Sequence, residues 1–220
     1  MSVPADRETR PKGCSMQSWQ RIARRIRVPL GFVSAAVFLV TIARHTPNAT
    51  AIAWSLALVL PGLALRAAAS GTVKKNRELT VTGPYAYTRN PLYLGSTLIA
   101  AGFAVAALSW PLALLLAVGF ALIYIPVIAS EEKFLRSTFP NFNAYCRLVP
   151  RFFPRLTPAM LTALQDLPVS QPVTLGTSAG FSFRLYLQHR EYNAALGAIL
   201  LYLSLLFLHP VLQHVLRGAR

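Results

Sequence analysis

Long apolar runs follow one another along the chain and predict membrane-spanning helices. A helix needs about 20 mainly apolar residues to cross the hydrocarbon core of a bilayer. Five runs approach or reach this length: 28–43, 50–69, 90–108, 111–130 and 193–209. The pattern therefore predicts an all-α integral membrane protein with about five transmembrane helices.

The ends of the third and fourth runs predict a tight helical hairpin. Ser109-Trp110-Pro111 forms a very tight turn where the third run gives way to the fourth. At the start of the third run, Asn90 is a favourable N-cap and Pro91 suits the first helical turn, where its missing N–H costs nothing. Gly95 and Gly102 lie one heptad apart, and we expect them to allow close helix packing.

The same pattern divides the chain into four parts. Residues 1–27 form a basic segment, and residues 28–156 form a core of four spans with their connecting loops. Residues 157–192 form a linker whose amphipathic stretch, 181–187, is expected to rest on the membrane surface. Residues 193–220 contain the fifth span and a tail. No small-residue cleavage site follows the first span, so we expect it to be retained as a signal anchor.

The positive charges are concentrated in three of the polar segments. Only 13% of the residues are charged, yet the net charge is +15. Of 22 Lys and Arg residues, seven lie in 1–27, five in 66–89 and seven in 131–192. By the positive-inside rule these segments are cytoplasmic, and the C-terminus is outside. We therefore expect location in a bacterial inner membrane, with the bilayer as partner and no nucleic-acid binding.

Neither the cysteines nor the histidines predict a metal site. Cys14 and Cys146 lie in segments assigned to the cytoplasm and are expected to be reduced thiols. Neither has metal-ligand spacing with any of the four histidines. We interpret the histidines as interfacial residues.

Two polar stretches are richer in aromatic and charged residues than simple connectors require. The first, 77–95, combines a Gly-Pro turn, three tyrosines, two arginines and a helix N-terminus with free N–H groups. The second, 131–151, begins with the adjacent carboxylates of Glu131 and Glu132. The tight hairpin brings the two stretches to one cytoplasmic level. They are therefore predicted to share a pocket for a ligand with a flat base and a positive centre, next to a lipid-like partner.

The residues in these stretches resemble the isoprenylcysteine carboxyl methyltransferase family, which belongs with the membrane phospholipid methyltransferases. The resemblance covers about residues 65–156. It is carried by Gly83-Pro84-Tyr85-x-Tyr87-x-Arg89-Asn90-Pro91-x-Tyr93-x-Gly95, then by Glu131-Glu132-x-x-Leu135-x-x-x-Phe139, Tyr145 and Val149-Pro150. It implies an S-adenosylmethionine-dependent methyltransferase acting on a membrane lipid or on a lipidated or other hydrophobic acceptor.

The resemblance also implies which residues bind the cofactor at a cytoplasmic site. Tyr85 and Tyr93 are suited to packing on the adenine or the sulfonium, and Glu131 to the methionine ammonium or a ribose hydroxyl. Glu132 is expected at the surface or in a salt bridge. The matching cofactor positions are Arg77, Glu78, Leu79, Thr80, Tyr85, Asn90, Pro91, Leu92, Tyr93 and Glu131.

No catalytic residue is assigned, and the candidates are Arg89, Asn90 and Glu131. The candidates on the substrate side are Tyr87, Tyr145 and Arg151.

Two differences from the family pattern leave the acceptor open. Asn90 stands where the family commonly has a histidine, and Val127 stands where the isoprenylcysteine enzymes carry an arginine. A phospholipid N-methyltransferase acting on phosphatidylethanolamine is therefore an alternative. Two alternatives of other classes are a nicotinamide-dependent membrane reductase of the sterol type and a non-enzymatic membrane partner.

Overall fold

A computed structural model describes residues 33–34, 36–41, 48–74, 78–158 and 180–208, and no sheet occurs among them. The predicted segment 1–27 and much of the linker 157–192 lie outside these residues. Residues 33, 34 and 36–41 are helical. The further elements are α2 (Ala49–Thr72), the 3-10 turn η1 (Gly83–Ala86), α3 (Pro91–Ala106), α4 (Trp110–Thr138), α5 (Phe142–Leu148), α7 (Phe183–Gln188), α8 (Tyr192–Leu203) and the π-helical turn η2 (Ser204–Leu208).

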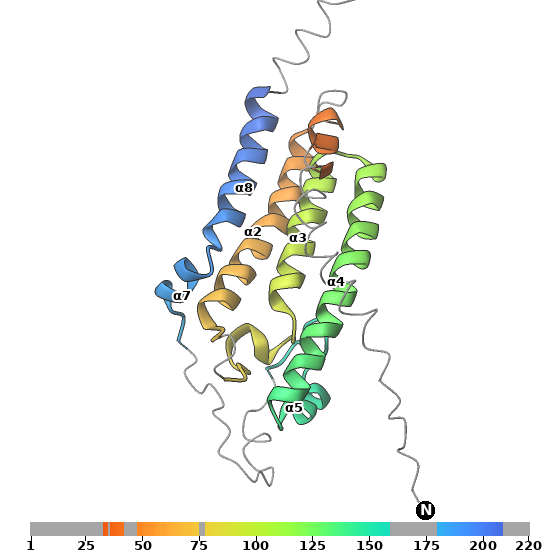
Figure 1. Ribbon diagram of the computed structural model, residues 1–220. Coiled ribbons are helices and arrows are strands. Elements are labelled where there is room, and N and C mark those ends of the chain that lie inside the picture. Colours follow the sequence, from red (N-terminus) through yellow and green to blue (C-terminus); the bar gives the residue numbers. More distant parts are fainter. Residues whose placement is uncertain (1–32, 35, 42–47, 75–77, 159–179, 209–220) are drawn as a thin grey trace, which may run out of the picture.

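Four of the helices lie lengthwise beside one another (Figure 1). α2 lies between α8 and α3, and α4 follows on the far side of α3, while the short helices α5 and α7 lie toward one end. α2 and α4 are long and apolar enough to cross a membrane, and α3 and the helical stretch Tyr192–Phe207 are shorter apolar helices. The all-α prediction is therefore confirmed for the described residues.

The apolar side chains of the two long helices lie mostly on the outside of the protein. Only 22% of the most apolar window of each helix is buried. On α4, for example, Leu114, Leu122 and Ile125 are all more than half exposed. A core helix of a water-soluble protein would bury such residues, whereas a bilayer solvates them. This exposure supports an integral membrane protein.

The predicted hairpin between the third and fourth runs is present. α3 ends at Ala106, and α4 begins at Trp110. Leu108 makes the turn with a left-handed φ of 48°. The Ser109 hydroxyl accepts a hydrogen bond from the Leu112 N–H at 3.3 Å and caps α4. The turn is therefore made by Leu108 and Ser109, while Trp110 and Pro111 of the predicted turn already belong to the first turn of α4.

The fourth helix continues about two turns beyond Ser130, where the apolar run ends. Residues 131–138 are mostly polar, and the Phe139 N–H closes the last turn on the Leu135 carbonyl at 2.8 Å. Leu135 and Phe139 pack against an apolar cluster formed by Leu79, Val81, Phe142, Tyr145 and Val149. The extension places Glu131 and Glu132 on a rigid helix.

Glycines set the close approach of α2 and α3, as the spacing of Gly95 and Gly102 predicts. A Cβ atom on Gly102 would lie 2.5 Å from Val59 Cγ2 and 2.9 Å from the Ser55 carbonyl oxygen. A Cβ atom on Gly95 would lie 2.7 Å from the carbonyl oxygen of Gly62 in α2. α2 and α3 therefore pack backbone against backbone, which fixes the start of α3 beside the end of α2.

Gly102→Leu is expected to destabilise the protein by about 1–3 kcal/mol, because the new side chain has no space against Val59 and Ser55. Thermal unfolding in detergent measures the effect. Gly197→Leu on α8 is the matched control, since a Cβ atom there meets nothing within 4 Å. Equal unfolding midpoints for the two variants would contradict the packing role of Gly102.

Candidate functional site

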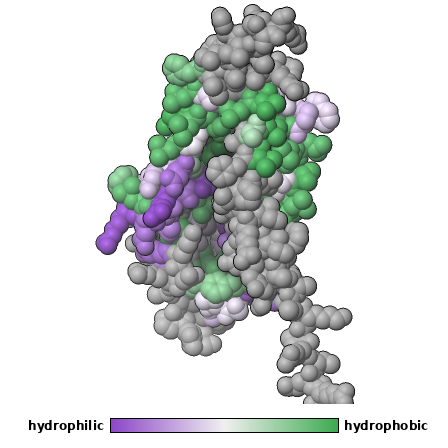
Figure 2. Space-filling view, turned by 45° about the horizontal axis from the view of Figure 1, so that its top comes forward, coloured by the Kyte–Doolittle hydropathy of each residue, from purple (hydrophilic) through white to green (hydrophobic). Residues whose placement is uncertain are grey.

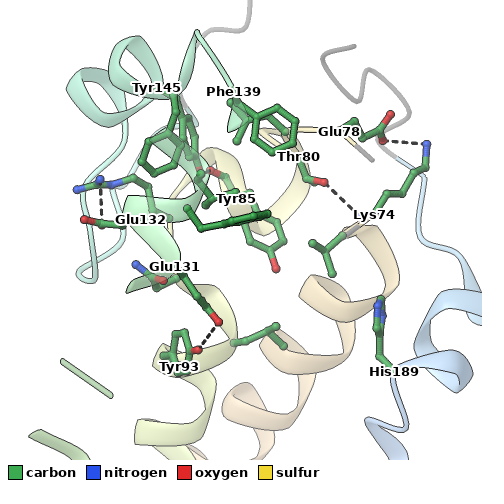
Figure 3. Close-up of a pocket in the computed structure, with 18 of the residues that line it drawn as sticks. Lys74, Glu78, Thr80, Tyr85, Tyr93, Glu131, Glu132, Phe139, Tyr145 and His189 are labelled. Carbon is green, nitrogen blue, oxygen red and sulfur yellow. Dashed lines mark hydrogen bonds and ion pairs between the residues drawn. The ribbon is translucent and has the colours of Figure 1, made fainter. Parts of the chain in front are cut away.

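A cavity of about 500 Å³ lies at the end of the bundle that carries α5 and α7 (Figure 3). Residues from α2, the loop after it, α3, α4, α5 and the corner between α7 and α8 contribute to its walls. The lining residues are Arg66, Val73, Lys74, Glu78, Leu79, Thr80, Tyr85, Arg89, Asn90, Leu92, Tyr93, Ser96, Glu131, Glu132, Phe134, Leu135, Phe139, Phe142, Tyr145, His189 and Glu191.

Aromatic side chains form one wall of the cavity. Figure 3 shows Tyr85, Phe139 and Tyr145 close together on this wall. The Tyr145 hydroxyl donates a hydrogen bond to the Tyr85 carbonyl oxygen at 2.7 Å, which ties α5 to η1. The chain turns into η1 at Gly83, whose φ of 58° is readily adopted only by glycine. The turn thereby directs Tyr85 into the cavity.

Burial keeps both tyrosine hydroxyls neutral. Burial raises the pKa of Tyr85 well above its usual value, and the nearby carboxylates of Glu131 and Glu191 add to the effect. Burial likewise raises the pKa of Tyr145, with a smaller contribution from Tyr85. Tyr85 therefore presents a neutral hydroxyl beside carboxylates, so it can act as a hydrogen-bond donor there.

The loop between α2 and η1 supplies the opposite wall. Lys74 Nζ forms an ion pair with Glu78 Oε1 at 2.9 Å, and the Lys74 N–H donates to Thr80 Oγ1 at 3.4 Å (Figure 3). The next residues, Leu79 and Val81, are buried in the apolar cluster with α5. The ends of the loop are therefore anchored, and Glu78 to Thr80 border the cavity.

Asn90 does not cap α3 with its side chain, contrary to the expected N-cap. Its Nδ2 instead donates to the Arg151 carbonyl oxygen at 2.8 Å. The Arg89 N–H donates to the Pro150 carbonyl oxygen at 3.0 Å, and Thr88 Oγ1 donates to the Phe152 carbonyl oxygen at 2.9 Å. These three bonds fasten the segment after α5 along the start of α3. Asn90 is 7% exposed, and its side-chain amide helps to hold this segment in place.

Tyr93 and Glu131 meet across the hairpin. The Tyr93 hydroxyl donates to Glu131 Oε1 at 2.9 Å, and the Tyr93 ring lies edge-on to Tyr124 with centroids 4.8 Å apart. Glu131 remains exposed at the cavity wall. The sequence expectation that Asn90–Gly95 and Glu131 share one pocket is therefore met by the geometry.

Glu132 is buried, with 6% of the residue exposed. Its carboxylate forms ion pairs with Arg89 Nη1 at 3.0 Å and with Arg151, whose Nε donates to Oε1 at 3.0 Å. Arg89 Nη1 also donates to Cys146 Sγ at 2.7 Å. The hydrogen bond to Glu132 raises the pKa of Arg151, which stays charged. Of the two expectations for Glu132, the salt bridge is confirmed and the surface position is wrong.

The corner between α7 and α8 closes the remaining side of the cavity. Arg66 Nη2 and Glu191 Oε2 are 2.6 Å apart, and His189 Nδ1 lies 3.0 Å from the Ser70 carbonyl oxygen. The sequence reasoning missed these residues and placed the histidines at the interface without a role. A signal was present, because an arginine inside an otherwise apolar span is costly and is usually paired or functional.

A family comparison bears on this geometry. Residues 67–141 match the model of the phospholipid methyltransferase family, and this segment belongs to that family. The phospholipid methyltransferase segment contains the end of α2, the loop, α3 and α4, and thus most of the cavity wall. The sequence resemblance is confirmed at this level.

Two bacterial relatives match a stretch of 84 residues. The cobalt-zinc-cadmium resistance protein CzcN of Cupriavidus metallidurans is 43% identical over 84 residues. The nickel-cobalt-cadmium resistance protein NccN of Alcaligenes xylosoxydans xylosoxydans is 44% identical over 84 residues. Each alignment covers 38% of this chain and 39% of the relative. No solved structure matches the chain.

Most of the predicted site residues line the cavity, but three do not. Pro91 is packed in the first turn of α3, Tyr87 lies at the surface, and Arg151 is engaged with Glu132. Arg77 lies outside the described residues. The predicted residues that line the cavity are Glu78, Leu79, Thr80, Tyr85, Arg89, Asn90, Leu92, Tyr93, Glu131 and Tyr145. Within the described part of the chain, no three His, Cys, Asp or Glu side chains gather as metal ligands.

Glu132→Ala is expected to destabilise the protein by about 3–5 kcal/mol, because it leaves the Arg89 guanidinium buried without its carboxylate. The exposed neighbour is the control: Lys133→Ala should change the stability by no more than about 0.5 kcal/mol. Thermal midpoints in detergent measure both. A Glu132→Ala protein as stable as Lys133→Ala would contradict the network.

As far as Tyr85 and Tyr145 contribute, the free energy of unfolding is expected to be independent of pH below about 10 and to fall above it. Their pKa values are raised above 10.0 in the folded protein, so the unfolded chain loses these protons first as the pH rises. Unfolding midpoints measured across this range test the effect. The double variant Tyr85→Phe/Tyr145→Phe should show a shallower decline, and an unchanged decline would refute the assignment.

Proposed function

We propose that the chain is a membrane-embedded methyltransferase that uses S-adenosylmethionine and methylates a lipid or another hydrophobic acceptor. One observation carries the proposal: the aromatic and acidic side chains of the phospholipid methyltransferase segment converge on a single cavity at the end of an apolar helix bundle. The volume of about 500 Å³ is within the usual range for sites of small ligands and cofactors.

The residues of the cavity fit this cofactor chemically. The rings of Tyr85, Phe139 and Tyr145 offer faces for a flat base, and aromatic faces attract a positive centre such as a sulfonium. The carboxylates of Glu78 and Glu131 suit an ammonium group or ribose hydroxyls. Lys74 supplies positive charge for a carboxylate.

S-adenosylmethionine, when bound, supplies a methyl group that is already activated by the sulfonium. The protein therefore has to align the reactants and exclude water. The tight packing of α2 on α3 and the strap of residues 150–152 on Thr88–Asn90 hold the walls in fixed positions. Tyr93 orients the Glu131 carboxylate by its hydrogen bond.

Glu131 has a different task for each of the two acceptor classes. A carboxylate acceptor, as in a prenylated cysteine, needs no base. An amine acceptor, as in phosphatidylethanolamine, must lose a proton, and Glu131 is the exposed carboxylate at the cavity wall that accepts it. Asn90 has no titratable imidazole and is held by the Arg151 carbonyl, so it serves as a positioning residue.

We further propose that the cavity faces the cytoplasm in a chain with five spans. The described cations Lys74, Arg89, Arg136, Arg151 and Arg190 belong to the segments that border this end of the bundle. The positive-inside rule then puts this end and the N-terminus in the cytoplasm, where a water-soluble cofactor is available, and the C-terminus outside.

Purified protein in detergent is expected to bind S-adenosylhomocysteine, and calorimetry measures the affinity. Glu131→Gln should weaken binding by about tenfold, since a charge-assisted hydrogen bond is lost. Tyr93→Phe should weaken it less, because only the orientation of Glu131 is affected. Lys133→Ala is the exposed control on the same helix. Protein that binds a nicotinamide cofactor instead would favour the reductase alternative.

Methyl transfer from isotopically labelled S-adenosylmethionine into total membrane lipids is expected with the unaltered protein. Mass spectrometry of the labelled product then identifies the acceptor and the atom that is methylated. Cofactor binding without transfer to any lipid would contradict the proposed acceptor class. Neither binding nor transfer, in detergent and in lipid bilayers, would overturn the function.

A further inference from the structure

A second hollow, of about 220 Å³, lies between α2 and the α7–α8 corner. Apart from Arg66 and Glu191, which also border the main cavity, its lining consists of apolar or aromatic side chains. We call it the side groove. The apolar and aromatic residues of the side groove are Leu63, Ala64, Ala67, Tyr186, Ala194 and Ala195.

Only the Arg66–Glu191 pair is common to the side groove and the cavity, so it stands between them. Arg66 Nε and Nη2 both donate to Glu191 Oε2, at 3.0 and 2.6 Å. The third nitrogen, Nη1, contacts α3: it donates to Ser96 Oγ and to the Leu92 carbonyl oxygen. The two side chains are only 15% and 14% exposed. The Arg66 side chain, which comes from α2, is thus held against α3 by hydrogen bonds. Its carboxylate partner, Glu191, comes from the corner between α7 and α8.

The part that carries Glu191 joins two helices through a strained residue. Arg190 connects α7 to α8 with a left-handed φ of 54°, a conformation that is unfavourable for a residue other than glycine. The corner is held against α2 by Glu191 on Arg66 and by His189 on the Ser70 carbonyl oxygen. Release of Glu191 would therefore remove one of the polar ties that hold this corner and let it relax.

The surroundings of the side groove suit an amphiphilic ligand, because they are apolar on one side and charged at the inner end. On α8, Leu196, Ile199 and Leu200 are more than half exposed, as expected for a helix in contact with hydrocarbon. Figure 2 shows hydrophobic residues gathered over one part of the molecule and hydrophilic residues over another, below it on the same face. A hydrocarbon chain suits the small alanines of the groove, and an anionic group suits the guanidinium at its inner end.

We propose that the side groove is the acceptor's route into the cavity: it holds the hydrocarbon chain of an anionic amphiphile, whose headgroup oxygen replaces Glu191 on Arg66. The proposal rests on the proposed methyltransferase function, since it assigns the acceptor side of the same site. Ser96, which Arg66 contacts, lies one helical turn from Tyr93 on α3. A headgroup on Arg66 would therefore stand beside the Tyr93–Glu131 pair.

Photo-crosslinking tests the hydrocarbon part of the proposal without any need for activity. The probe is palmitic acid with a diazirine in its chain, added to purified protein in detergent. Peptides that contain residues 63–67 and 194–195 should carry most of the label. Ala195→Phe, which fills the groove, should reduce that labelling by about tenfold. Ile199→Phe, an exposed position of α8 outside the groove lining, should leave it unchanged.

Glu191→Gln tests the role of the ion pair, because the proposal and a purely structural bridge predict opposite signs. If Glu191 competes with the headgroup, Glu191→Gln should strengthen binding of the anionic probe by several-fold and leave an uncharged probe, the same chain esterified to glycerol, unaffected. Arg66→Gln should weaken the anionic probe alone. A bridge with only a structural role would weaken or spare both probes equally, and that result overturns the proposal.

A third probe with the same chain and a phosphate monoester distinguishes the headgroups. Tighter binding of the phosphate identifies a phospholipid-type acceptor, and tighter binding of the fatty acid identifies a carboxylate acceptor; both support the groove. Labelling spread evenly over the exposed face of α4 would mean ordinary surrounding lipid and would refute it.

Measurement of cofactor binding distinguishes failure of the acceptor-route proposal from failure of the proposed methyltransferase function. Protein that binds S-adenosylhomocysteine and transfers methyl groups, but does not take label in the groove, contradicts the acceptor route alone. Absence of cofactor binding contradicts the proposed function even if the groove takes label.

Discussion

The buried carboxylate of Glu132 joins the two halves of the cavity. It sits on the last turns of α4 and forms ion pairs with Arg89, before α3, and with Arg151, after α5. A buried charge of this kind is tolerated only when its partners are in place. The loop before α3, the end of α4 and the segment after α5 therefore have to be assembled together. The hydrogen bonds from Asn90 and Arg89 to the carbonyl oxygens of residues 151 and 150 join the same two segments, the start of α3 and the chain after α5.

Close helix packing supplies the complementary constraint. The glycines of α2 and α3 allow the backbones to touch, and the Ser109 cap reverses the chain within a single short turn. Helices that approach so closely leave no freedom in their relative position along the axis. The start of α3 and the end of α4 consequently meet at one level, which is why Tyr93 reaches Glu131.

The sequence predicts the helices and the hairpin, because hydropathy, turn residues and glycine spacing are local signals, and the family resemblance supplies about half of the cavity residues. It does not predict how polar groups choose partners across long separations. Asn90 is a good N-cap by type, yet a carbonyl 61 residues away takes its amide. Glu132 reads as a surface residue beside Glu131, although one step along a helix turns the two carboxylates in different directions. Arg66 finds its carboxylate 125 residues away, in the last part of the fold.

The pairing of α2 with α8 has a consequence for how the protein is made. Tyr202 shares a hydrogen bond with Ser55 at 2.6 Å, and Glu191 pairs with Arg66, so the last described helix docks on the first of the long ones. During synthesis Arg66 enters the bilayer well before its partner emerges from the ribosome. Until α8 is inserted, α2 therefore lies in the membrane with the Arg66 charge unpaired by Glu191. In this interval water, lipid headgroups or the insertion machinery must shield that charge.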